Sequence, residues 1–271
     1  MEVKLTEGTR SSKRVFVGSD THCGAYAGLT HPDYFFVPAD TKIAQTQQTC
    51  WDFFSEKADK YKPYDIVILN GDIVTGKNPK SGGRQIMTHS MKDQCKIAVK
   101  VIEYLDCPKV RITRGTPYHV APGGDHWEDI LVEMLPKDYD VRIKNHGFYK
   151  INGVNFDVKH KIGSSSIPHG RLTALAREIL WANIWHDKGV QPRPKVLIRS
   201  HVHYDEQIYH DDCWGIITPA LQGLGDEYGE LQCSGTVSFG FMVIDVFDDG
   251  EIKITPEIMK GFMQCSQPEV L

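Results

Sequence analysis

Aspartate and histidine residues recur at short spacing in several places along the chain. The groups are Asp20-x-His22, Gly71-Asp72, Gly115-Thr116-Pro117-Tyr118-His119, His160, and Ser200-His201-x-His203. Carboxylate oxygens and imidazole nitrogens are good ligands for borderline divalent metal ions. Two adjacent ions that share one carboxylate form a clamp for a phosphoryl group. The residue types therefore indicate metal-assisted chemistry, and Asp72, which follows a glycine, suits the shared position.

Each group has a simpler interpretation when it is taken alone. An Asp-x-His after a strand is most often an Asx-turn with a surface histidine. A Gly-Asp is most often a turn, and a single histidine at a strand end, such as His160, is more often a satisfied structural residue. The pair His201 and His203 is more specific, because two imidazoles at alternating positions suit one metal ion. All the groups in this order, each behind an apolar run, are hard to obtain by chance.

The apolar runs before these groups predict buried strands, and longer periodic segments predict helices. The predicted strands are Arg14–Gly18, Asp65–Leu69, Val110–Thr113, Val154–Val158, Lys195–Arg199, Phe239–Phe247 and Glu251–Thr255, the last two around an Asp249-Gly250 hairpin turn. The predicted helices are Thr41–Tyr61, Thr88–Leu105 and Arg171–Trp185. Ligand sites in α/β sheets collect at the carboxyl ends of strands. We therefore expect the aspartates and histidines to meet at one edge.

The order of these elements predicts an α/β fold. Strands and helices alternate in the first half, and an antiparallel-rich portion follows. We expect two mixed sheets packed face to face, with helices outside, in a single domain over residues 1–271 whose core spans about 14–255. Residues 1–12 and 265–271 are expected to be loosely held ends.

Composition excludes several classes of protein. The chain has 271 residues, of which 41% are hydrophobic and 24% are charged, which is ordinary for a globular protein. Its net charge of −4 argues against a sequence-independent duplex binder that relies on charge alone. No apolar run is long enough to cross a bilayer and the first residues do not form a secretory signal, so we expect a cytoplasmic protein with no membrane partner. The 7 scattered cysteines predict reduced thiols.

The series Asp20-x-His22, Gly71-Asp72, Gly115…His119, His160 and Ser200-His201-x-His203 resembles the calcineurin-like metallophosphoesterase family. The resemblance runs from about residue 14 to about residue 255. Two local strings, Arg114-Gly-Thr-Pro-Tyr-His119-Val and His160-Lys-Ile-Gly-Ser-Ser, look most like members encoded by phages and prophages. The resemblance implies a four-layer α/β/β/α sandwich.

The resemblance also implies a role for each site residue. Asp20, His22 and His203 would hold one metal ion, Asp72 would bridge both, and His160 and His201 would help to hold the second. Thr116 stands where the family has an asparagine ligand of the second ion. His119 lies two residues beyond the position of the catalytic histidine, and is either that histidine or a surface residue past a redesigned turn. Asp205 would orient the neighbouring ligand histidine.

A metal-dependent phosphoric ester hydrolase is the function that follows. The two divalent ions would be manganese, with iron, zinc, nickel or magnesium as alternatives, and would activate a water for in-line attack on phosphorus. The expected substrate is a phosphodiester in a nucleotide or single-stranded nucleic acid. The alternatives are a phosphomonoesterase acting on proteins or small molecules, and a non-catalytic accessory protein on the same fold. Lys77 and Arg84 would line the substrate path or lie in a solvated loop, and the oligomeric state is open.

Three other features have structural interpretations. The string Asp125-His126-Trp127-Glu128 is expected to cap and begin a helix that runs through Leu135. Trp181 and Trp185, four residues apart on a predicted helix, are expected in the core. The run Ser164-Ser165-Ser166 is interpreted as a polar turn, with contact to a phosphate as the alternative.

Overall fold

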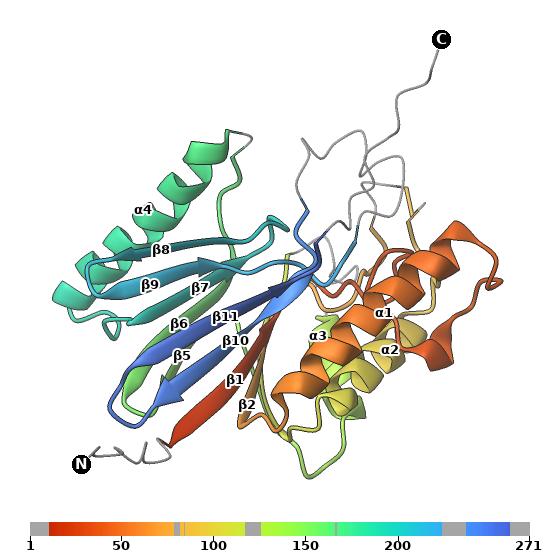
Figure 1. Ribbon diagram of the computed structural model, residues 1–271, viewed down its shortest axis with the longest axis horizontal. Helices are drawn as coiled ribbons and strands as arrows, with labels where there is room; N and C mark the ends of the chain where they lie inside the picture. The colour runs from red at the N-terminus through yellow and green to blue at the C-terminus, as the bar shows by residue number, and fades with distance from the viewer. Residues whose placement is uncertain are drawn as a thin grey trace, which may run out of the picture.

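The computed structural model describes residues 11–78, 82–83, 85–116, 126–165, 167–223 and 237–260 (Figure 1). The first sheet consists of β1 (Ser12–Gly18), β2 (Ile66–Asn70), β3 (Lys109–Thr113), β4 (Asp140–Lys144), β10 (Gly240–Phe247) and β11 (Ile252–Ile258). The second consists of β5 (His146–Ile151), β6 (Val154–Lys161), β7 (Val196–Ser200), β8 (Glu206–His210) and β9 (Cys213–Ile217). The helices are α1 (Lys42–Tyr61), α2 (Met91–Tyr104), α3 (Trp127–Met134) and α4 (Pro168–Asp187), with a short 3₁₀ turn, η1 (Pro32–Tyr34).

Both sheets are mixed. The first has the order β11-β10-β1-β2-β3-β4, in which β1 to β4 are parallel and the hairpin β10–β11 adds two antiparallel strands beside β1. The second has the order β5-β6-β7-β9-β8, with a parallel centre and an antiparallel strand at each edge. The carboxyl ends of β1, β2 and β3 therefore lie at one edge of the first sheet.

The sheets pack face to face, and helices cover both outer faces (Figure 1). In β1, Val15 and Val17 face the second sheet while Phe16 packs against the helices α1 and α2, as the two-residue period of a strand requires. Burial on both faces explains why this strand is continuously apolar. Helix α4 covers part of the second sheet through Leu175 and Ile179. The predicted four-layer α/β/β/α arrangement is confirmed.

Most predicted elements lie within a few residues of their expected bounds. Thr41 caps α1 by accepting a hydrogen bond from the Ala44 amide, and Ser90 caps α2 in the same way. The strands of residues 140–151 and 206–217 were not predicted. Most side chains of β4, β5 and β8 are half-buried or exposed, so these segments lack the continuous apolar runs of the central strands. Strand β9 is mostly buried but is only five residues long.

The prediction that Trp181 and Trp185 lie in the core is wrong. Their side chains are 48% and 39% exposed. The two rings stack on each other with centroids 5.9 Å apart. The face of α4 that packs on the sheet is occupied by smaller side chains, among them Leu175 and Ile179, so the tryptophans are left on the solvent side.

Two further observations bear on the class of protein. None of the helices in the described part of the chain is long and apolar enough to cross a membrane. The cysteines that the structure describes are free and buried, as the sequence predicts.

Candidate metal centre

The loops that follow β1 and β2 run side by side at the carboxyl edge of the first sheet. The Asp20 amide donates to the Gly71 carbonyl over 3.0 Å, and the His22 amide donates to the Asp72 carbonyl over the same distance. This backbone pairing fixes Asp20 and Asp72 next to each other. The loop after β7 joins them, because the His201 amide donates to Asp20 Oδ2 over 3.2 Å.

The side chains form two overlapping groups whose ligand atoms lie within 4.8 Å of one another. The first group is Asp20, His22 and His203; the second is Asp20, Asp72, His160 and His201. The Nε2 atom of His203 lies 3.2 Å from Asp20 Oδ1. On the other side, the Nε2 atom of His160 lies 3.0 Å from Asp72 Oδ2 and 3.9 Å from Asp20 Oδ1. Asp20 stands in both groups.

The backbone of the site is unusual. The residues with a left-handed conformation include five members of the two groups: Asp20 (φ 49°), His22 (φ 40°), Asp72 (φ 50°), His201 (φ 79°) and His203 (φ 59°). This conformation costs a non-glycine residue about 1–3 kcal/mol and persists only where the surrounding structure enforces it. Its concentration here is typical of a functional site.

Two glycines allow the site to close. A Cβ atom on Gly115 would lie 2.0 Å from Asp72 Oδ1, and one on Gly71 would lie 2.4 Å from His160 Nδ1. Gly71 also has a φ of 82°, which other residues adopt only with strain. Both positions therefore need glycine, as the sequence has it before Asp72 and before Thr116.

Electrostatics favour the ionised form of Asp20. The side chain is fully buried, which opposes ionisation, but His160 and His203 beside it hold the pKa of the carboxyl well below its usual range. Its Oδ1 atom accepts no hydrogen bond of ordinary geometry from the described residues. A buried carboxylate oxygen without such a bond is costly unless a cation balances it. The donor set thus fits divalent ions.

His160 is also buried, and its orientation is fixed. Its Nδ1 atom donates to the Asn70 carbonyl over 2.5 Å, so Nε2 faces Asp72 and Asp20. Burial lowers the pKa of an imidazole, but the two carboxylates and these hydrogen bonds outweigh it and raise the pKa of His160 to about 9. A backbone carbonyl behind the ring is a common way to aim a ligand histidine.

A chain of buried polar side chains behind the ligands joins the two sheets. Asn70, at the end of β2, donates to Ser200 Oγ at the end of β7 over 2.7 Å. Ser200 pairs with Thr218 over 2.6 Å, and Thr218 with Ser19 over 2.7 Å. No role was predicted for Asn70, Ser19 or Thr218. Ser19 and Asn70 each stand directly before a ligand group, whereas Thr218 follows β9 and has no such signal in the sequence.

Thr116 lies next to Asp72. Its amide donates to Asp72 Oδ1 over 2.6 Å, and its hydroxyl lies 3.3 Å from both carboxylate oxygens. Glu128, predicted as part of a helix start, reaches the same loop: its Oε1 accepts a hydrogen bond from the Gly115 amide over 3.3 Å. Burial, helped by the charge of Asp72, raises the pKa of Glu128. The carboxylates of Asp72 and Glu128 thus accept hydrogen bonds from the neighbouring amides of Thr116 and Gly115.

Removal of the hydrogen bond between Glu128 and the Gly115 amide is expected to weaken metal binding. Glu128→Ala should lower the affinity for Mn²⁺ by roughly 10–100-fold, the usual effect of losing an outer hydrogen-bond partner. Glu128→Gln should retain most of the affinity, because its amide oxygen can still accept from Gly115. Isothermal titration calorimetry with Mn²⁺ measures both. Glu133→Ala, an exposed position on the same helix, is the matched control, and wild-type affinity in Glu128→Ala would contradict the positioning role.

The structure brings six of the predicted site residues together, Asp20, His22, Asp72, His160, His201 and His203. Lys77 is exposed in the loop after Val74. His119 and Arg84 lie outside the described residues. The helix predicted after Asp125 is present as α3, with His126 at its N-cap but without a side-chain capping bond. Ser165 bonds the backbone of Ile167, as in a polar turn.

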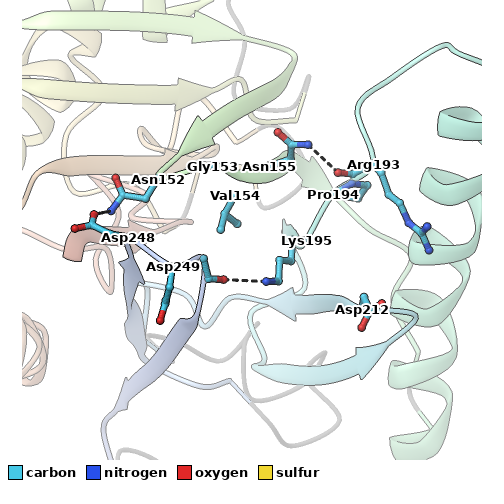
Figure 2. A pocket seen from close by; sticks show the side chains of 11 residues that line it. Asn152, Gly153, Val154, Asn155, Arg193, Pro194, Lys195, Asp212, Asp248 and Asp249 are labelled. Atoms are coloured by element: carbon cyan, nitrogen blue, oxygen red, sulfur yellow. Dashed lines mark hydrogen bonds between the residues drawn. The ribbon is translucent and has the colours of Figure 1, made fainter. Parts of the chain in front are cut away.

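A separate surface pocket lies at the opposite ends of the strands. Figure 2 shows it between the turn before β6, the start of β7 and the β10–β11 hairpin. Its polar groups bond one another: Asn152 donates to Asp248 over 3.0 Å, and Lys195 to the Gly250 carbonyl over 2.8 Å. These bonds join three turns, so we interpret the pocket as structural.

Comparison with known proteins adds a likeness of fold. No protein-family model matches the sequence, and no curated protein matches it. Among solved structures, an archaeal phosphodiesterase is similar with a TM-score of 0.47 and 15% identity over 90% of this chain and 99% of that one. A predicted phosphoesterase from Streptococcus pneumoniae has a TM-score of 0.40 and 10% identity over 93% of this chain and 95% of that one. Zinc-bound Vps29 from Entamoeba histolytica is similar with a TM-score of 0.42 and 14% identity over 90% of this chain and 98% of that one.

These likenesses are too low to carry activity from those proteins to this chain. What the molecule itself defines is an α/β/β/α sandwich with a buried cluster of aspartates and histidines that could hold metal ions.

Proposed function

We propose that this protein is a metal-dependent phosphoric ester hydrolase with two divalent ions at the centre described above. The observation that carries the proposal is the pair of overlapping ligand groups that share the buried Asp20. A shared carboxylate between two ligand sets is the arrangement of two-metal phosphoesterases. The resemblance to calcineurin-like enzymes in the order of the ligand residues supports the same assignment.

The ions would be held by Asp20, His22 and His203 on one side and by Asp72, His160 and His201 on the other. Such a pair of ions lowers the pKa of a bound water and neutralises charge on the phosphoryl group. Hydrogen bonds within the chain orient the ligands. The Asn70 carbonyl accepts from His160 Nδ1 and so orients its ring, and the Thr116 amide donates to the Asp72 carboxylate. A bridging role for Asp72, a ligand role for Thr116 and a catalytic role for His119 stay predictions, as does the use of manganese.

The preferred substrate is a phosphodiester in a nucleotide or a single-stranded nucleic acid. This preference rests on the resemblance to phage-encoded enzymes and on the lysine-bearing loop that follows Asp72. A phosphomonoester of a protein or small molecule is the alternative. An activity screen with Mn²⁺ separates the two when it compares a bis-aryl phosphodiester, an aryl phosphomonoester, a cyclic nucleotide and single-stranded DNA. Faster hydrolysis of the monoester than of every diester would overturn the preference.

Metal removal tests the class of function itself. Purified protein is expected to contain up to two divalent ions per chain, and excess chelator should abolish hydrolysis, because in the proposed reaction the bound ions would activate the attacking water. Elemental analysis and a chelation series measure this, with activity restored by Mn²⁺ as the control. Full activity with no detectable metal would contradict the proposal. A metal-loaded protein inactive on all four substrates would favour the accessory-protein alternative.

A further inference from the structure

Helix α4 has apolar side chains on two opposite faces. One face, with Leu175 and Ile179, packs on the second sheet. On the outer face, Leu180 is 55% exposed, and Trp181 and Trp185 stand beside it. Figure 1 shows α4 as the outermost element beyond β8 and β9, with no described element over its outer face. A helix that is apolar all round is normally buried on all sides.

The outer face carries a regular seam. The seam is defined as Thr173, Arg177, Leu180, Ile184 and Asp187. Their spacing of four, three, four and three residues is the heptad spacing that keeps one stripe of a helix facing a partner helix. Every seam residue is exposed or half-buried in the single chain. The seam is therefore available and suited to a second helix.

The charges of the seam specify which helix fits. When two copies of α4 pack antiparallel, Leu180 of one copy lies opposite Ile184 of the other, and Arg177 lies opposite Asp187. Neither Arg177 nor Asp187 forms an ion pair with another described residue of its own chain. The antiparallel arrangement pairs both charges twice around a twofold axis. A parallel arrangement would instead set Arg177 against Arg177 and Asp187 against Asp187.

We propose that the protein forms a twofold symmetric dimer through the α4 seam, with a second copy of this chain as the partner. An isologous contact requires a patch that is complementary to itself, and the seam meets that requirement in its residue spacing and its charges. Trp181 and Trp185 flank the seam and become partly covered in the dimer. Aromatic residues beside a central apolar contact are common in protein interfaces. The candidate metal centre lies at the strand ends, outside this contact.

Sedimentation velocity over a range of protein concentrations tests the dimer. The wild-type chain is expected to sediment as a dimer that dissociates on dilution. Leu180→Glu should yield a monomer, because it places two carboxylates at the centre of the contact. Leu172→Glu is the matched control: Leu172 is 36% exposed on the same helix but lies off the seam, so the dimer should persist. Circular dichroism checks that both variants keep their helix content.

Charge reversal tests the antiparallel pairing. Arg177→Asp and Asp187→Arg should each weaken the dimer at least about tenfold in Kd, since each sets like charges against each other in two places. The double variant should recover affinity close to wild type, which a fold defect would not allow. A wild-type chain that is monomeric at every concentration would overturn the proposal. So would a dimer that Leu180→Glu leaves intact, or single reversals that the double variant does not rescue.

Discussion

Replacement of Asp20 by asparagine is expected to remove both metal ions and nearly all hydrolysis. Asp20 is the residue common to the two ligand groups, and it is fully buried with a pKa held well below its usual range. The amide keeps the size of the side chain but loses its charge. The loss should exceed the roughly 10–100-fold effect of an outer hydrogen-bond partner. Activity and bound metal are measured together in excess Mn²⁺.

The variants Asp72→Asn and His203→Ala test which carboxylate is shared by the two ions. His203 belongs to one ligand group only, so in excess metal its loss should cost less than the loss of Asp20, which belongs to both. If Asp72 bridges both ions, Asp72→Asn should lose both. If Asp20 alone is shared, Asp72→Asn should retain the ion held by Asp20, His22 and His203. Counting ions per chain decides between the two arrangements.

A matched control separates metal binding from general destabilisation. Asp157 is as deeply buried as Asp72, but it pairs with Arg199 over 2.7 Å and with His146 over 2.8 Å, away from both ligand groups. Asp157→Asn should lower the free energy of unfolding yet leave the bound metal unchanged. Near-normal turnover of Asp20→Asn would contradict the assignment of the centre.

Metal affinity is expected to rise steeply with pH between about 7 and 9. The pKa of His160 is raised to about 9, so at neutral pH its Nε2 carries a proton when no metal is bound. An ion that uses this nitrogen must displace the proton. Affinity should therefore rise by roughly tenfold per pH unit until the pKa is passed. Calorimetry in two buffers of different ionisation enthalpy measures the release of about one proton at pH 7.

The stability of the metal-free protein should change in the opposite direction. The folded pKa of His160, about 9, exceeds the unfolded value of 6.5. Its contribution is therefore complete below pH 6.5 and disappears as pH rises through 9, a loss of roughly 3 kcal/mol at about 1.4 kcal/mol per pKa unit. Urea unfolding with chelator present measures it. Metal affinity independent of pH, with flat stability over this range, would show that His160 is neutral at pH 7.

The sequence by itself determined the central strands and the ligand residues. The strand β1 is apolar at successive positions because both of its faces are buried, so its run of residues predicts a strand without further information. Polar residues directly after such runs must lie at the strand ends. The chemistry of Asp20, His22, Asp72 and His201 then follows from residue type, and the structure brings these residues together as expected.

The edge strands could not be predicted in the same way. Residues 140–144 alternate between exposed and half-buried positions, and their pairing with β3 is what makes them a strand. The hairpin β10–β11 was predicted, but its place beside β1 in the first sheet was not. The pairing of β1 with β10 joins residues more than two hundred positions apart. It depends on which apolar faces meet in the folded chain, which the local sequence of either strand does not specify.

The arrangement within the site was also decided by tertiary structure. Glu128 accepts a hydrogen bond from the Gly115 amide and Asn70 joins the two sheets, and both contacts depend on which residues lie beside them in the folded chain. The exposed face of α4 is a second case. Periodicity shows that Trp181 and Leu175 lie on different faces of a helix, but only the packed sheet shows which face is covered. Residue type sets the chemistry a side chain can perform, whereas its neighbours across the fold set its burial, its charge and its partners.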